Sequence, residues 1–205
     1  MSRYEITNPE LDSMTSYDID NLISKVFVYQ LHLLGEATFG FLMQNLLMQN
    51  ARRVEMFAMY HSQLYFQQIH ILIYKLILDN SGKSSINIQK LFNLILKKNY
   101  RPELETEIKN IRADFNSEIV KKFHDLLELV RIFRTKLNAH IVAVPIEAKP
   151  HLKKDSDSFA IEMIPMIQEV FRQYIRLLNL CKINHDLHQY TDINNLIKKR
   201  MEIMQ

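Results

Sequence analysis

The segment from Glu128 to His140 carries an arginine and a histidine whose types and spacing suit chemistry on a phosphodiester. Apolar residues recur through it at gaps of three and four, at Ile119, Phe123, Leu126, Val130, Phe133, Leu137 and Ile141. This pattern predicts a helical face that must be buried. At about 100° per residue, Arg134 lies on one side of that face and His140 on the other. A permanent cation and an imidazole that titrates near neutral pH would then border whatever packs against the face.

The position of His140 near the end of this helix adds to its interest. Pro145 follows closely and disfavours helical backbone at the residue before it, so we expect the helix to cover about 117–142. His140 then lies in the last turn or two, where the negative end of the helix dipole favours imidazolium.

The same residues carry a resemblance to a known family. Arg134-Thr-Lys-Leu-Asn-Ala-His140 resembles the Arg-x(4–6)-His signature of HEPN domains, and the helical pattern around it resembles the abortive-infection (type U) branch of that superfamily. The stretches 69–79 and 84–96 are similar to the family's preceding helix, turn and short helix. The resemblance covers roughly residues 50–180.

The resemblance implies an all-α, antiparallel helical bundle, here with an N-terminal helical extension. It also implies a metal-independent endoribonuclease, of the kind found in toxins and phage-defence effectors, with Arg134 and His140 as catalytic residues and no cofactor. RNA, a second copy of the chain and a cognate antitoxin are the implied partners. Some toxins of the family carry a modified tyrosine two residues after the histidine, but this chain has Val142 there, so that form of regulation is not expected.

In such an enzyme the RNA 2′-hydroxyl attacks the adjacent phosphorus and the 5′-oxygen leaves. His140 would act as general base or acid, and Arg134 would bind the phosphate with its rigid fork of donors. One helix supplies one such histidine, so acid and base together call for a second imidazole. A two-fold homodimer in which the 117–142 helices approach one another would supply it.

Several neighbouring residues are candidates for RNA contact. Asn138 lies on the Arg134 side of the helix, where it either holds a phosphate oxygen or is solvated. Arg131 either touches neighbouring phosphates or forms an ion pair with Glu128 or Asp125. The loop 143–158 is basic and either guides an RNA backbone or is an ordinary solvated loop; its candidates are Lys149, Lys153 and Lys154.

A function of another class fits most of the same features. A non-catalytic, HEPN-like helical module for protein interaction, dimerisation or RNA binding would also show amphipathic helices. In that case His140 is a helix-end residue bonded to a carbonyl, and Arg134 is a surface residue. The two alternatives differ in whether Arg134 and His140 are exposed in a groove near their symmetry mates.

Composition limits the class of protein. Apolar residues make up 47% of the 205 residues, and there are only three glycines and five prolines, which favours helices joined by short turns. The single cysteine, Cys181, excludes a disulfide framework and lies among apolar neighbours, so we expect a buried thiol. The net charge of +3 permits RNA binding without requiring it. No signal peptide or membrane span is expected, which favours a cytoplasmic protein.

The chain pattern predicts a loose lead-in over 1–20 and a single all-α domain over 21–205. The expected helices cover about 21–47, 53–79, 86–98, 103–115, 117–142, 165–183 and 193–204. We expect Asp18 or Asp20 to cap the first of these helices, Ser84 or Ser85 the third and Asp192 the last, while Pro165 starts the sixth. Gly35 and Gly40 mark either a kink or a close helix contact.

Metal chemistry is not expected from the histidine spacing. His61 and His70 are nine residues apart, and His185 and His188 share a helical face with only Asp186 and Asp192 nearby. No glycine-rich phosphate loop is present, so the sequence does not support an ATPase.

Overall fold

The computed structural model describes residues 13–50, 56–79, 87–97, 100–134 and 156–203. This part of the chain is almost entirely helical and contains no strand, which confirms the all-α class. The α-helices are α2 (Ser16–Leu22), α3 (Tyr29–Asn50), α4 (Met56–Ile73), α5 (Ile88–Lys97), α6 (Glu105–Phe115), α7 (His124–Ile132), α9 (Ser156–Leu180) and α10 (Ile193–Ile203). π-helical turns form η1 (Ile23–Val28), η2 (Tyr74–Leu78) and η4 (Asn116–Lys121), and 3₁₀ turns form η3 (Pro102–Leu104) and η7 (Leu187–Asp192).

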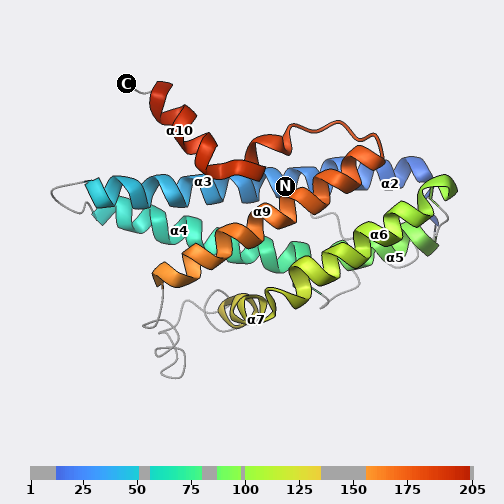
Figure 1. The fold of residues 1–205 in the computed structure, drawn as a ribbon, viewed down its shortest axis with the longest axis horizontal. Helices are drawn as coiled ribbons and strands as arrows, with labels where there is room; N and C mark the ends of the chain where they lie inside the picture. Colours follow the sequence, from blue (N-terminus) through green and yellow to red (C-terminus); the bar gives the residue numbers. More distant parts are fainter. Residues whose placement is uncertain (1–12, 51–55, 80–86, 98–99, 135–155, 204–205) are drawn as a thin grey trace.

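Two long helical stretches lie side by side and the other helices pack around them (Figure 1). The stretch α2–η1–α3 is continuous, and α4 packs along α3. Helix α9 crosses both in this view, and Val170, Phe171 and Leu178 on its inner face have no exposed surface. Helices α5 and α6 lie at one end, while α7, seen nearly end-on in Figure 1, packs against α4 and η2.

The first helix begins earlier than the sequence indicated. It starts at Ser16 rather than near Asn21, and Thr15 is its N-cap instead of Asp18 or Asp20. Thr15 and Asp18 form a capping box, in which the Asp18 N–H donates to Thr15 Oγ1 at 3.3 Å and the Thr15 N–H donates to Asp18 Oδ2 at 2.8 Å. The Thr15 hydroxyl and the Thr15 N–H, which both donate to the Asp18 carboxylate, lower the pKa of Asp18.

Helix α5 is also capped by a residue other than the expected serines. The Asn87 side chain accepts a hydrogen bond from the Lys90 N–H at 2.9 Å and donates to the Asp79 carbonyl at 3.2 Å. One buried amide therefore caps α5 and also binds a carbonyl at the end of the preceding helix. Ser84 and Ser85 lie outside the described residues.

The expected helix 117–142 is wrong in its described part, because the chain breaks it into two elements. The π-turn η4 ends at Lys121, and Phe123 leaves the helical conformation at φ −108° and ψ 29° before α7 starts at His124. After this break α7 buries Leu126, Leu127 and Val130. The predicted apolar face is nevertheless buried within this chain, since Ile119 and Val130 have no exposed surface.

Pro165 does not start a helix. Helix α9 begins at Ser156 and continues through Pro165, which removes one backbone hydrogen bond. The proline is exposed, while Met163, Met166 and Ile167 on either side of it are buried. Core packing on both sides of the proline therefore stabilises a helix that the local sequence disfavours.

The C-terminal segment packs back over α3. Asp192 caps α10, as predicted, by accepting a hydrogen bond from the Asn195 N–H at 3.1 Å. The Tyr190 hydroxyl donates to Glu36 at 2.6 Å, and His32 lies 2.5 Å from Asp186. Cys181 is fully buried, as its apolar neighbours indicated.

One described helical stretch, Ser16–Leu47, is long and apolar enough to cross a membrane by length and composition alone. A helix that fills the core of a protein passes the same test, and Phe27, Leu31 and Leu34 of this stretch are fully buried. The test therefore does not distinguish a membrane span from a core helix here.

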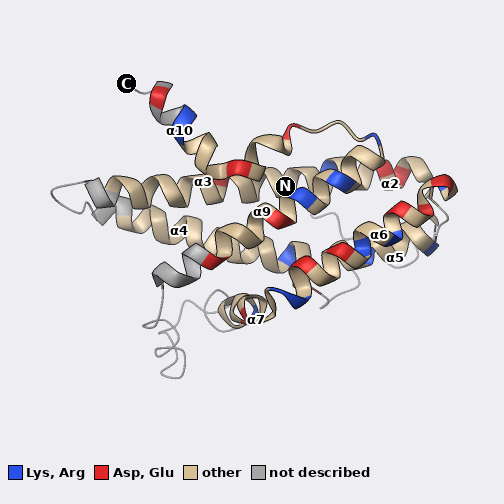
Figure 2. Cartoon of the chain, viewed as in Figure 1, with Lys and Arg blue, Asp and Glu red and all other residues tan. Residues whose placement is uncertain are grey.

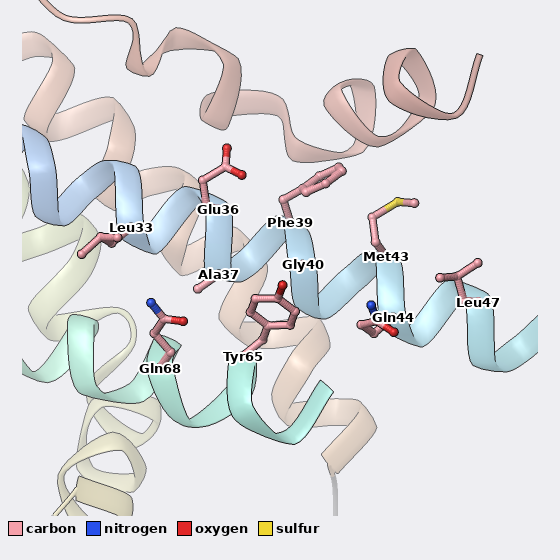
Figure 3. Close-up of a pocket in the computed structure, with 10 residues that line it drawn as sticks. All are labelled: Leu33, Glu36, Ala37, Phe39, Gly40, Met43, Gln44, Leu47, Tyr65 and Gln68. Carbon is pink, nitrogen blue, oxygen red and sulfur yellow. The ribbon is translucent and has the colours of Figure 1, made fainter. Parts of the chain in front are cut away.

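Gly35 and Gly40 mark close contacts between elements. A Cβ atom at Gly35 would lie 2.5 Å from the Tyr190 ring, and one at Gly40 would lie 2.6 Å from the ring of Tyr65. Figure 3 shows the Tyr65 ring directed across at Gly40. The Ser62 hydroxyl, which donates to Asn45 at 3.0 Å, joins the same pair of helices. The two glycines therefore let aromatic rings approach the α3 backbone.

We predict that Gly35→Ala lowers the free energy of unfolding by roughly 1–3 kcal/mol, although alanine is the better helix former. The Tyr190 ring is buried and would meet the new methyl group along its inner edge. Gly40→Ala should cost less, because it meets the outer end of the partly exposed Tyr65 ring. Thermal melts of the two variants, with Thr106→Ala on exposed α6 as control, test this; a Gly35→Ala protein more stable than wild type would contradict it.

Candidate functional site

The end of α7 is anchored to α4 by an aromatic cluster. Phe133 contacts Phe66 with ring centroids 5.9 Å apart and His70 with centroids 4.8 Å apart. Phe66 and His70 contact each other at 4.2 Å. Because Phe133 directly precedes Arg134, these contacts determine where the arginine backbone lies.

His70 is neutral in the folded protein. Its side chain is fully buried, and desolvation lowers its pKa from the ordinary 6.5 to about 4, although a hydrogen bond to the Phe66 carbonyl acts in the opposite direction. The Nδ1–Phe66 O distance of 2.6 Å makes Nδ1 the protonated nitrogen, since a carbonyl only accepts. Without exposed surface, His70 serves packing and cannot touch a substrate.

Arg134 lies against Tyr74, the first residue of η2. Its guanidinium carbon is 5.9 Å from the centre of the Tyr74 ring, a cation–π contact, and the side chain is half-buried. Its Nε is buried, and no hydrogen-bond acceptor for it is found among the described residues. A buried donor without an acceptor costs about 1–3 kcal/mol, so this nitrogen would gain from an anionic oxygen placed beside it.

Arg131 is engaged in an ion pair. Its Nε and its Nη2 each lie 3.0 Å from Glu128 Oε2, one helical turn earlier. This is the pairing that the sequence offered as the alternative to phosphate contact. Both side chains are largely exposed, and exposed pairs of this kind contribute little to stability and exchange readily with solvent.

The remaining predicted site residues lie outside the described part of the chain. These are His140, Asn138, Lys149, Lys153 and Lys154. The structure therefore describes two of the predicted site residues, Arg134 and Arg131. Of these two, only Arg131 has a carboxylate partner among the described residues.

Three further residues at the site, Tyr74, His70 and Phe66, are not indicated by the sequence pattern. They recur at four-residue spacing along α4 and the start of η2, where they face Phe133 and Arg134. The spacing alone indicates a shared helix face, but their contact with the arginine is a tertiary fact that a single-helix pattern does not contain.

No alternative metal or small-molecule site emerges from the described residues. None of their histidine, cysteine and carboxylate side chains forms a group of three that could hold a metal ion. The His185 and His188 rings lie 5.0 Å apart, but His185 is bonded to Asn179 and His32 is paired with Asp186. A shallow hollow of about 520 Å³ over α3 has one ionisable carboxylate, Glu36, and the Tyr190 hydroxyl already donates to it.

Comparison with known proteins identifies no relative: no family model, curated protein or solved structure matches the chain. The function is therefore inferred from the residues of the chain.

The buried His70 predicts a dependence of stability on pH. Its folded pKa lies below its unfolded pKa, so between about pH 6.5 and 4 the unfolded chain binds a proton that the folded chain does not. The free energy of unfolding should therefore decrease as the pH is lowered through this window, by up to roughly 3 kcal/mol from this group. His70→Phe should flatten the slope, whereas His124→Ala, which removes an exposed histidine on α7, should preserve it. Urea titrations at several pH values measure the slopes; equal slopes for His70→Phe and wild type would contradict the prediction.

Proposed function

We propose that the chain is a metal-independent endoribonuclease of the HEPN type, acting as a toxin or phage-defence effector in the cytoplasm. In this proposal the helices form an antiparallel HEPN-like bundle with an N-terminal extension. RNA and a second copy of the chain are its partners, with a cognate antitoxin as a further one. Arg134 and His140 carry the reaction at the homodimer interface.

The observation that carries the proposal is the environment of Arg134. The guanidinium is half-buried against Tyr74, and its Nε has no acceptor among the described residues. A structural arginine on a helix surface usually pairs with a nearby carboxylate, as Arg131 does with Glu128. Arg134 instead has an N–H donor available for a phosphate oxygen. The donor is partly shielded from water, and such shielding strengthens a charge-assisted hydrogen bond.

The proposed chemistry assigns one role to each residue. Arg134 binds a non-bridging phosphate oxygen and stabilises the charge that develops as the RNA 2′-hydroxyl attacks the phosphorus. His140, five intervening residues later, moves the proton, and its counterpart in the second copy serves the leaving 5′-oxygen. The products are a 2′,3′-cyclic phosphate and a free 5′-hydroxyl.

Contacts along the RNA backbone complete the proposal. Asn138, Lys149, Lys153 and Lys154 would hold neighbouring phosphates, and Arg131 would join them by leaving Glu128. These contacts are electrostatic and non-specific, so they predict binding that weakens steeply with salt.

The proposal predicts cleavage of single-stranded RNA in EDTA that depends on both residues. His140→Ala should lower the rate by about 10²–10⁴, because the proton transfer is lost. Arg134→Lys should also lose most activity, since a point charge does not reproduce the planar fork. The assay is end-labelled RNA with purified full-length protein, followed by analysis of the cleaved ends.

Matched controls change a histidine and an arginine that have no part in the proposed site. His124→Ala removes an exposed histidine of α7, and Arg172→Lys alters an arginine of α9 that is paired with Glu169. Both controls should retain most of the cleavage. Equal cleavage by wild type and His140→Ala would overturn the catalytic assignment, and a wild type that cleaves none of several RNAs would favour the non-catalytic module.

A further inference from the structure

Helix α4 and the half of α3 beside it are without formal charge. Residues 37–50 and 56–74 contain no aspartate, glutamate, lysine or arginine, although charged residues make up 24% of the chain. In Figure 2 the coloured part of α4 contains no charged residue, in contrast to α6 and α9. A surface helix without charge is unusual, because solvent-facing positions are where proteins place most of their charged residues.

The exposed side of α4 has the residue spacing of a helix that packs against another helix. Tyr60, Leu64, Gln67, Ile71 and Tyr74 follow one another at gaps of four, three, four and three, and we call them the α4 stripe. Tyr60 is 61% exposed, Leu64 is 42% exposed, Gln67 is exposed, and Ile71 and Tyr74 are half-buried. The alternation of four and three is the spacing by which one helix face meets another along its length.

The chemistry of the stripe selects the kind of partner. From Tyr60 to Ile71 it offers no cation to neutralise phosphates, and Lys75 and Arg134 lie only at its Tyr74 end, which disfavours nucleic acid along its length. Helices that lie on membranes carry lysine and arginine on their polar face, and α4 has neither. Exposed tyrosine and leucine without charges are typical of the centre of a protein–protein interface.

The occupant that best fits this chemistry is the same stripe of a second chain. A two-fold interface places a patch against its own copy, so a charged residue near the two-fold axis would meet the same charge of its symmetry mate. A patch without charge avoids that repulsion, and the central Gln67 can bond to its symmetry mate, since an amide both donates and accepts. The described part of the apolar face predicted over 117–142 does not serve instead, because Ile119 of η4 and Val130 of α7 are already buried within one chain.

We propose that the chain forms its homodimer through the α4 stripe, helix against helix. This inference rests on the homodimer of the proposed function. It does not depend on RNA cleavage. It also deepens that function, because Tyr74 at the end of the stripe is the ring against which Arg134 lies. The interface would thus run directly to the edge of the candidate site.

The test is the association of the full-length chain measured by sedimentation. Wild type should dimerise, with a Kd in the micromolar range, because a single helix pair gives an interface near the small end of specific contacts, roughly 1,000 Å². Leu64→Glu with Gln67→Glu should weaken dimerisation at least about tenfold, because four carboxylates would then meet at the interface. Both positions are exposed, so the monomer should fold normally, which circular dichroism checks.

The matched control adds the same two charges elsewhere. Thr106→Glu with Asn110→Glu lies on the exposed face of α6 and should dimerise like wild type. A second measurement does not depend on charge: Gln67→Cys should be cross-linked between chains by a short bismaleimide, and Thr106→Cys should not. Cys181 is buried and should not react under native conditions.

Several results would overturn the proposal. One is a wild type that stays monomeric up to about 200 µM, above the micromolar range expected of a small specific interface. Another is a stripe variant that dimerises as tightly as wild type, which would place the contact elsewhere. Co-sedimentation of a monomeric wild type with phosphatidylcholine–phosphatidylserine vesicles would assign the surface to lipid instead.

The dimer and the ribonuclease can fail separately. Loss of dimerisation in the stripe variant together with unchanged cleavage by His140→Ala would retain the interface and reject the enzyme. Unchanged dimerisation of the stripe variant together with loss of cleavage in His140→Ala would retain the enzyme and reject the interface. If both hold, the stripe variant should also lose cleavage at concentrations where wild type is dimeric.

Discussion

The helix from Met56 to Leu78, formed by α4 and η2, is packed on three sides, and the arrangement of the candidate site depends on it. It packs along α3 through the contact of Tyr65 with Gly40, and it holds α7 through Phe66 and His70. The Tyr174 hydroxyl of α9 donates to the Leu76 carbonyl at 3.4 Å on a further side. Its remaining face carries tyrosine, leucine and glutamine, with no charge from Met56 to Tyr74 and with Lys75 exposed in η2. Packing of this one helix therefore positions Arg134, while the uncharged side of α4 stays exposed.

Local sequence patterns predicted much of the fold, and the errors have a common cause. Helical periodicity, the scarcity of glycine and the Asp192 cap gave the all-α class and the last helix start. The break at Phe123 and the continuation of α9 through Pro165 were missed, because tertiary packing overrides the local preference at both places. The cap of α5 was missed because Asn87 also bonds to the end of the preceding helix, a contact that no single segment reveals.

The sequence was enough to predict which residue types form the candidate site. It was not enough to predict which side chains surround them. Spacing identified Arg134 and offered an ion pair as the alternative for Arg131, which is the arrangement found. The contact of Arg134 with Tyr74 joins residues sixty positions apart in sequence, so periodicity along one helix could not supply it. The same contact distinguishes the two arginines: one is satisfied by a neighbouring carboxylate, and the other lies on an aromatic ring with a buried donor available. The proposed function thus depends on the different surroundings of two arginine side chains, Arg131 and Arg134.

The most direct test of this difference is NMR of the arginine side-chain Nε–H groups in the ¹⁵N-labelled chain. The titrant is a short RNA whose 2′-hydroxyls are all methylated, so that it cannot be cleaved. The Arg134 signal, assigned by its loss in Arg134→Lys, should shift in a saturable way as a phosphate oxygen binds its Nε–H. The Arg131 signal should move less, because Glu128 already accepts from it. An Arg134 signal that is unchanged at saturating RNA, or that moves less than the Arg131 signal, would contradict the assignment of Arg134 as the phosphate-binding residue.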